Sequence, residues 1–403
     1  MKNFLTLIPL VILFFTSGCI PESMMLKPLP EDPRTPAVIA AFLPLSGENR
    51  IYAEQMKEGL LFAETEINSR NGINGKQIKV IFYDTNGSAA GTLEAVSKAE
   101  QDNAVAAIAG YSTTEVSNLV KYAAPKRMPM IIPMATSDYH LQAGAFVCRN
   151  SFSDTQQMEV LANYLIHWRK TYTGAVITDY DGDREYARGI TRNFIQAVSD
   201  NGGTISSSET IGENGMISRE QLVRLLATDP RFILVAAQGK RAALLLKKLR
   251  EAGFSGIICG PDSWDQHEFI SHLAGSEPGE CIFTAFFHPE NDSRAYLEFH
   301  QKFRKKFFHN PGACETQSYD ALNFLCIALS NAEHILDFDR NWRTIRNHSG
   351  AAALYTGLPG GGIDRTIYLK SIGIDRSGEK TRPYARLSKK LQHSDLKKYR
   401  IIE

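Results

Sequence analysis

The feature that most constrains the fold is a regular alternation of short apolar runs with segments of helical period. Residues 38–43 form an apolar run that predicts a buried strand. In the next segment the apolar residues recur at i, i+4, i+7 and i+11 and so share one helical face. These residues are Met56, Leu60, Ala63 and Ile67. Strands that alternate with helices at this spacing predict β-α-β units and parallel sheets covered by helices on both faces.

The alternation runs to about residue 134 and restarts after residue 150. The predicted strands are 38–43, 78–82, 104–109, 130–134, 175–178, 232–236 and 256–259. The predicted helices lie near 56–67, 90–101, 115–124, 161–168, 190–198 and 240–251. Two such units in succession predict an α/β protein with two doubly wound lobes and a cleft between them. Ligands of open α/β sheets bind beyond the carboxyl ends of the strands, so the loops that follow strands are where we expect a site.

Composition excludes several classes of protein. The chain has 403 residues, of which 43% are apolar, and this length predicts two domains with a sizeable core. Its 45 basic and 44 acidic residues leave a net charge of +1, which argues against a nucleic-acid-binding protein. The cysteines and histidines lack the paired spacing of a zinc site, and we expect neither a metal nor a cofactor.

The N-terminus predicts export. Residues 1–18 combine Lys2 with a short apolar run and small residues, the composition of a signal peptide. Cys19 directly after Ser17-Gly18 resembles the lipobox of bacterial lipoproteins, although Thr16 stands where that family usually has Leu. The resemblance implies that Cys19 carries lipid and anchors the protein at the cell envelope. The alternative is a plain signal peptide with an incidental cysteine.

Residues 19–36 contain five prolines and predict an extended tether between the anchor and the folded part. Five cysteines follow in the mature chain, and an odd number leaves at least one thiol free. Cys259 and Cys281 each stand in a predicted strand and are the pair that we consider for a disulfide.

Small polar residues follow several of the predicted strands. They are Ser46-Gly47, Ser112-Thr113-Thr114, Thr136-Ser137 and Asp262. Hydroxyls and backbone N–H groups at helix N-termini suit a carboxylate, and an acid opposite them suits an ammonium group, so this set fits an amino-acid zwitterion. Structural roles are also open: Ser112 and Glu115 have the spacing of a capping box, and Asp262 follows Gly-Pro as turn residues do.

Five motifs in order carry a resemblance to a known family. They are PLSG at 44–47, EGLLFAETEINSRNGINGKQIKVIFYD at 58–84, AIAGYSTTEV at 107–116, MIIPMATS at 130–137 and IICGPDSWD at 257–265. Over about residues 38–375 the chain resembles the type I periplasmic substrate-binding proteins of ABC transporters, of the leucine/isoleucine/valine and amide families. That fold has two lobes joined by a three-strand hinge.

The resemblance implies a ligand site between the lobes. Its residues are Tyr52, Thr113, Thr114, Met134, Ala135, Thr136, Tyr186, Gln238 and Asp262. Thr114 and Thr136 would bind the α-carboxylate, and Asp262 would receive the ammonium group. Gln238 stands where the branched-chain binders have a tyrosine, and Met134 is bulkier than their usual alanine. Branched-chain specificity is therefore not implied.

The resemblance also implies the lobe boundaries. Lobe one would comprise 36–150 and 285–360, and lobe two 151–284 and 361–395. Gly360-Gly361-Gly362 stands near the last crossing between the lobes, where glycine suits a hinge, although a surface turn would use the same residues.

These patterns predict a solute-binding lipoprotein and not an enzyme. His267 and His272 are five residues apart, not four, so they cannot share a metal as HExxH does. Residues 110–114 lack the second glycine of a nucleophile elbow. We expect capture of an amino acid or amide and delivery to an ABC permease, with no nucleic-acid partner. The alternative is a lipid-anchored sensor or protein-interaction module on the same fold without a transporter.

Overall fold

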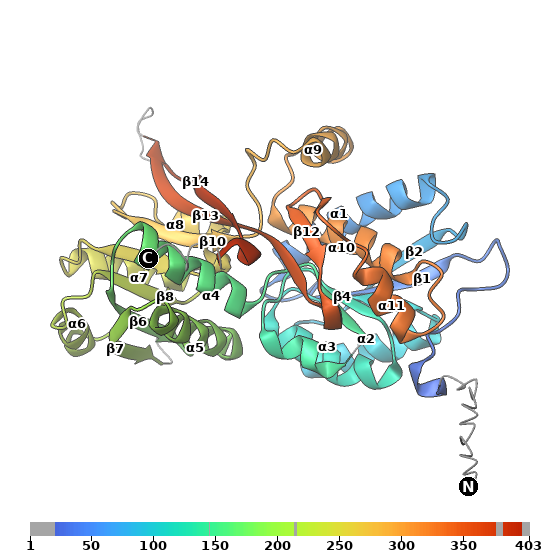
Figure 1. Ribbon diagram of the computed structural model, residues 1–403, viewed down its shortest axis with the longest axis horizontal. Coiled ribbons are helices and arrows are strands. Elements are labelled where there is room, and N and C mark those ends of the chain that lie inside the picture. Colours follow the sequence, from blue (N-terminus) through green and yellow to red (C-terminus); the bar gives the residue numbers. More distant parts are fainter. Residues whose placement is uncertain (1–20, 145, 213–215, 376–381, 397–403) are drawn as a thin grey trace, which may run out of the picture.

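The computed structural model describes residues 21–144, 146–212, 216–375 and 382–396, and the predicted signal peptide and Cys19 lie outside these ranges. Two lobes lie side by side, each with a central sheet between helices (Figure 1). We call lobe one the part around the sheet of β1 to β5, and lobe two the part around the sheet of β6 to β10.

Lobe one contains a five-stranded parallel sheet in the order β2-β1-β3-β4-β5. Its strands are β1 (Ala37–Leu43), β2 (Ile78–Asp84), β3 (Ala106–Ile108), β4 (Met130–Ile132) and β5 (Val147–Arg149). Its helices are α1 (Arg50–Ser69), α2 (Ala89–Gln101), α3 (Thr113–Ala123), α9 (Arg294–Phe307), α10 (Ala313–Leu329) and α11 (Ile335–Trp342). The short elements are η1 (Glu22–Met24), η2 (Ala124–Lys126), η3 (Asp138–Ala143), η6 (Pro359–Gly361), β11 (His348–Ser349) and β12 (Leu354–Gly357).

Lobe two contains parallel strands in the order β7-β6-β8-β9-β10, extended by antiparallel β13 and β14. The strands are β6 (Thr173–Asp179), β7 (Thr204–Ile211), β8 (Phe232–Ala236), β9 (Ile257–Gly260), β10 (Cys281–Ala285), β13 (Ile363–Asp375) and β14 (Arg382–Gln392). The helices are α4 (Asp154–Asn163), α5 (Arg184–Asp200), α6 (Arg219–Leu226), α7 (Gly239–Glu251) and α8 (His267–His272). The short helical elements are η4 (Tyr164–Trp168), η5 (Asp262–Trp264) and η7 (His393–Asp395).

The alternation in the sequence predicts these lobes well. Each predicted strand and helix overlaps an observed one, and the periodic residues of α1, Met56, Leu60, Ala63 and Ile67, are all at most 5% exposed. The apolar faces pack on the sheets because burial there removes apolar surface from water.

The predicted disulfide between Cys259 and Cys281 is wrong. In the register of β9 and β10, Cys281 pairs with Ile258, so the two cysteines are one residue out of step. Successive side chains on a strand point to opposite faces of the sheet. Cys259 and Cys281 accordingly lie in different hydrophobic cores, and both are free thiols.

Arg365 joins the three segments that cross between the lobes. It lies on β13, which pairs with β12 near lobe one and with β10 in lobe two. Its guanidinium donates to the carbonyl oxygens of Asn150 (3.0 Å) and Phe286 (2.5 Å), which lie on the other two crossings. Arg365 is 0% exposed, and the stacked rings of Phe152 and Phe286 lie beside it. The hinge therefore has a buried cation at its centre.

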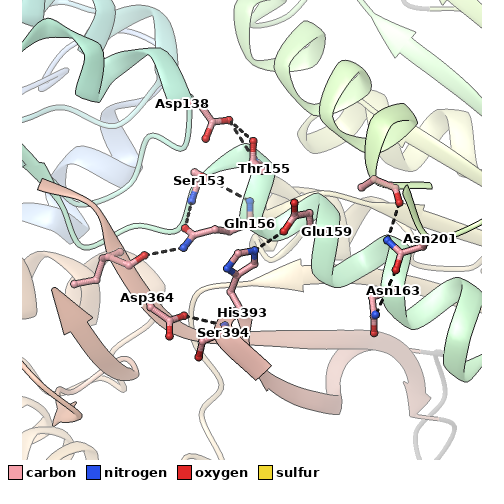
Figure 2. Close-up of polar contacts among 12 residues, drawn as sticks. Asp138, Ser153, Thr155, Gln156, Glu159, Asn163, Asn201, Asp364, His393 and Ser394 are labelled. Atoms are coloured by element: carbon pink, nitrogen blue, oxygen red, sulfur yellow. Dashed lines mark hydrogen bonds and ion pairs between the residues drawn. The ribbon is translucent and has the colours of Figure 1, made fainter. Parts of the chain in front are cut away.

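Helix α4 is also tied to the third crossing (Figure 2). The Gln156 side chain donates to the carbonyl of Ile363 at 2.7 Å, and His393 lies 2.5 Å from Glu159. The glycine run lies just before this crossing. Gly361 has a φ of +76°, and a Cβ there would lie 2.1 Å from the Val147 carbonyl oxygen, so this one glycine of the run is packed against β5, whereas Gly360 is exposed.

The proline-rich segment lies along lobe one and does not stand free as a spacer. The Leu26 N–H donates to the carbonyl of Glu333 at 2.9 Å, and Lys76 donates to the carbonyl of Asp32 at 2.7 Å. Leu26 is 8% exposed. Among the residues that the structure describes, no helix has the length and apolar character needed to cross a membrane.

Candidate functional site

The carboxyl ends of strands from both lobes face each other at the lobe boundary. Lobe one contributes the start of α3 and the loop after β4, and lobe two contributes the start of α5 and the loops after β8 and β9. Each loop follows directly from a strand of a parallel sheet, and parallel strands end at the same edge. The polar residues predicted from the sequence therefore lie together at this boundary.

Asp262 is the best-supported acid of this site. Its Oδ1 accepts hydrogen bonds from the Tyr186 hydroxyl (2.8 Å) and from the Gln157 amide (2.9 Å). Gln157 is itself oriented by the Thr284 hydroxyl, which donates to its Oε1 at 2.7 Å. Burial raises the pKa of Asp262 to about 6, and the hydrogen bonds from Tyr186 and Gln157 oppose that rise. At neutral pH the carboxyl is therefore ionised, with Oδ1 held in place.

Asp154 is a second buried acid beside Asp262. It is 1% exposed, and burial raises its pKa to about 8, with the charges of Asp138 and Asp262 adding to that rise. A Cβ at Gly189 of α5 would lie 2.5 Å from its Oδ2, so its carboxyl is packed directly against α5. At neutral pH Asp154 is mostly protonated, and the pair carries close to one negative charge.

The loop after β4 is held by a buried arginine. Arg149 donates to the carbonyl oxygens of Thr136 (3.0 Å) and Ser137 (2.5 Å) and is 1% exposed. The Thr136 carbonyl also accepts from the Asp154 N–H at 2.8 Å. The Thr136 hydroxyl is buried and lies beside the Asp154 carboxyl, whose pKa it lowers against the effect of burial. It makes no other hydrogen bond among the described residues, so a ligand carboxylate would compete with Asp154 for this donor.

Thr114 is engaged with lobe two. Its hydroxyl donates to Asp183 Oδ1 at 3.1 Å and its N–H to Oδ2 at 3.3 Å. Asp183 also caps α5, because its Oδ1 accepts from the Tyr186 N–H at 3.1 Å. The Asp183 carboxylate thus accepts the hydrogen bonds of Thr114, the residue that the resemblance assigned to a ligand carboxylate. Ser112 forms the predicted capping box with Glu115.

Aromatic rings form one wall of the lobe boundary. Tyr52, in the first turns of α1, stacks on Tyr111 with ring centres 4.6 Å apart and planes 9° from parallel. The Gln266 amide of lobe two donates to the Tyr111 hydroxyl. Tyr52 is thereby placed beside the boundary.

The remaining predicted residues lie deeper or apart. Thr113, Met134 and Ala135 are at most 6% exposed, and the Ala135 carbonyl accepts from the Ser151 hydroxyl at 2.9 Å. Gln238 is half-buried at the N-cap of α7. The structure brings Tyr186 into contact with Asp262, whereas Thr114 contacts Asp183 instead.

Sequence reasoning missed Asp154, Gln157, Asp183, Tyr111 and Gln266. Tyr111 stands in the strand-end loop that also holds Thr113, so its position was a usable signal. Asp154 and Gln157 lie on a helix that begins just after a crossing, and a single sequence gives no sign that such a helix faces the cleft.

One side-chain cluster of the described residues has the geometry to hold a metal ion. Ligand atoms of Glu58, His309 and Glu315 lie within 4.8 Å of one another. His309 Nε2 is 2.8 Å from Glu58, and this ion pair accounts for the arrangement without an ion. The cluster is in lobe one, on α1 and at the start of α10.

Comparison with known proteins identifies relatives of the chain. The model of a family described as periplasmic binding protein matches residues 36–364. A Leu/Ile/Val-binding protein homolog from Brucella melitensis is 24% identical over 248 residues, which are 61% of this chain and 66% of the relative. A leucine-, isoleucine-, valine-, threonine- and alanine-binding protein from Pseudomonas aeruginosa is 22% identical over 61% of this chain and 65% of its own length. The chain thus spans slightly less than two thirds of these relatives.

A solved structure shows the same fold. The leucine-binding protein LivK from Thermotoga maritima superposes with a TM-score of 0.75 at 21% identity, over 89% of this chain and 99% of that one. This agreement confirms the predicted two-lobed α/β architecture.

Proposed function

The chain belongs to the periplasmic binding protein family, and from that premise we propose that it captures an amino acid or a related small polar solute between its lobes and delivers it to an ABC permease. The family is one of binding proteins rather than enzymes, in agreement with the sequence prediction. The relative from Pseudomonas is named for binding five amino acids.

The observation that carries the proposal is a pair of acids at the lobe boundary, the buried Asp154 and the half-buried Asp262. Asp262 has one oxygen fixed by Tyr186 and Gln157 and is ionised at neutral pH, whereas Asp154 is mostly protonated. The pair therefore offers one negative charge in a region of low dielectric, which suits one ammonium group. Ammonium binding offsets the desolvation of Asp262.

The ligand carboxylate would bind on the lobe-one side. The hydroxyl of Thr136, beside the mostly protonated Asp154, is one donor, and the hydroxyl and N–H of Thr114 at the start of α3 are two more. Asp183 already accepts the hydrogen bonds of Thr114, so a ligand carboxylate would have to displace Asp183 to use these donors. The family resemblance places Met134 and Gln238 near the ligand side chain, where branched-chain binders carry other residues, and the ligand is accordingly not assigned as a branched-chain amino acid.

We further propose that the protein is exported and held at the cell envelope by lipid on Cys19. The Ser17-Gly18-Cys19 sequence and the family's periplasmic location support this placement. A lipid-anchored sensor without a transporter remains the second candidate. Genes for a permease and an ATPase beside this one would favour transport, and their absence would favour sensing.

Thermal unfolding of the protein against the twenty amino acids, small amides and urea tests the proposal, after unfolding and refolding to remove co-purified ligand. A ligand at about 100 times its Kd adds about 2.7 kcal/mol of stability, a shift of several degrees. We expect one chemical class to shift the wild type and Asp229→Asn, an exposed control, but not Asp262→Asn. No shift across the panel would contradict amino-acid binding.

A further inference from the structure

A second interlobe feature lies on the outer side of α5. It is a groove of about 1020 Å³ between that helix and lobe-one residues that include Ser137 and Tyr139. Arg184, Arg188 and Arg192 line it. These residues are four apart, so they lie on successive turns of one helical face and rise about 6 Å per step. We call this feature the arginine groove.

The charges of this arginine row are not neutralised within the protein. Asp181, the acid preceding the row, forms an ion pair with Arg241 at 2.6 Å. Two further acids, Asp183 and Glu185, flank Arg184 in the sequence. Each accepts a hydrogen bond from a hydroxyl of α3. In the described part of the chain, no carboxylate lies within ion-pair distance of the three arginines. Glu185 also lines the groove, so three arginines against one lining carboxylate leave it with an excess of positive charge.

Two tyrosines hold the arginine side chains in place. The guanidinium carbons of Arg184 and Arg188 lie 5.8 and 5.1 Å from the ring centre of Tyr180. That of Arg192 lies 5.1 Å from the ring centre of Tyr139, which is 49% exposed. An arginine side chain that is already held on a ring loses little conformational entropy when a partner binds. Arginine and tyrosine are also enriched among the residues that contribute most to binding between proteins.

We propose that the arginine groove binds an acidic segment of a partner protein in extended conformation, with carboxylates on alternate residues. Alternate side chains of an extended chain lie about 6.6 Å apart on one face, close to the step of about 6 Å between the arginines. Each guanidinium can then take one carboxylate with two parallel hydrogen bonds.

The size of the groove favours a peptide over a small anion. Its volume lies at the upper end of the range for small-molecule sites, about 300–1000 Å³, and the row spans about 12 Å over two turns. A phosphate or a single carboxylate would engage one arginine and leave the others unpaired. Because the walls come from both lobes, the partner would bind the arrangement in which the lobes are in contact.

The test uses the full chain and two synthetic decapeptides, one of alternating glutamate and serine and one of alternating glutamine and serine. We expect the glutamate peptide to bind with an affinity that falls steeply between low salt and 0.3 M salt, and the glutamine peptide not to bind. Arg188→Gln should weaken binding about fivefold, and the triple change Arg184→Gln, Arg188→Gln and Arg192→Gln about fiftyfold or more. Arg219→Gln on α6 is exposed and serves as the matched control.

Glutamine keeps the helix propensity of arginine, so the variants should fold, and an unchanged circular dichroism spectrum checks this. Equal binding by the triple variant would overturn the proposal. Inorganic phosphate that competes at equal molar concentration would show a small-anion site and also overturn it. Vesicles of phosphatidylglycerol that bind through the same arginines more tightly than the peptide would replace the protein partner with a membrane.

Discussion

Helix α5 contributes to two regions with opposite electrostatic character. Tyr186 points into the boundary, is 5% exposed and holds Asp262, whereas Arg184, Arg188 and Arg192 line the arginine groove. At about 100° per residue, Tyr186 lies about 200° around the helix from Arg184, so the two sets of side chains leave different faces of α5. The two regions still adjoin, because Thr114 of the inner site and Gly189, which faces Asp154, also line the groove.

The difference teaches that burial of the acids in the inner site and exposure of the arginines in the groove set how the two regions respond to conditions. Desolvation shifts the pKa of Asp154 and Asp262 into the range around neutrality, so the inner site should respond to pH. Salt should act on the arginine groove instead, because its charged side chains are exposed to solvent. The predictions below use these two responses to separate the regions.

Asp262→Asn should have the largest effect. It removes the charge that receives the ammonium group, which costs about 2–5 kcal/mol of ligand binding if the contact is buried, while acidic-peptide binding stays unchanged. Calorimetric titration of both ligands measures this. If Asp262→Asn weakened the binding of both the amino-acid ligand and the acidic peptide, the two regions would not be independent.

Arg365→Met should perturb the hinge that both regions share. It leaves the carbonyl oxygens of Asn150 and Phe286 buried without a donor, and we expect a loss of about 3 kcal/mol in the free energy of unfolding. Urea denaturation measures it, with exposed Arg346→Met as control. A change below about 1 kcal/mol would mean that the buried cation does not hold the crossings together.

Ligand affinity in the inner site should rise about tenfold from pH 5 to pH 7. Burial raises the pKa of Asp262 to about 6, so the carboxyl is mostly protonated at pH 5 and mostly ionised at pH 7, and only the ionised form attracts ammonium. Peptide affinity should stay constant, because arginine and exposed glutamate keep their charges over this range. Parallel pH dependence of both ligands would contradict the assignment to Asp262.

Asp183→Asn should give the smallest effect and the opposite sign. Removing the carboxylate charge weakens the competitor at Thr114, and we expect ligand affinity to increase about fivefold, or about 1 kcal/mol. Asparagine caps helices as well as aspartate does, so α5 should remain intact. Reduced affinity, measured by the same titration, would indicate that Asp183 binds the ligand instead of competing with it.

The sequence predicts the parallel cores well because periodic apolar residues report burial directly. Strands such as β1 and β8 and the apolar face of α1 lie where their patterns place them. The C-terminal third of the chain was not predicted at the level of its elements. Strand β13 pairs antiparallel with β14, which follows it directly, and also with β10, which lies far earlier in the sequence, and a local pattern carries no record of the second pairing.

The candidate site was predicted in outline through strand-end loops and motifs. Asp262 and Tyr186 do meet, but the contact of Thr114 with Asp183 depends on how closely the two lobes approach, which no spacing in the sequence specifies. The arginine row is visible in the sequence as a four-residue repeat. Its lack of acidic partners became clear only from the positions of Asp181, Asp183 and Glu185 in space.

The long strand β13 also has a consequence for the order of folding. The sheet of lobe two is completed by β13 and β14, and the three crossings are joined only once Arg365 is present. Since β13 is synthesised after every other strand of both lobes except β14, the nascent chain cannot close this architecture until Arg365 has been made. The export that we propose requires a chain that is still unfolded, and this connectivity delays closure of the two lobes accordingly.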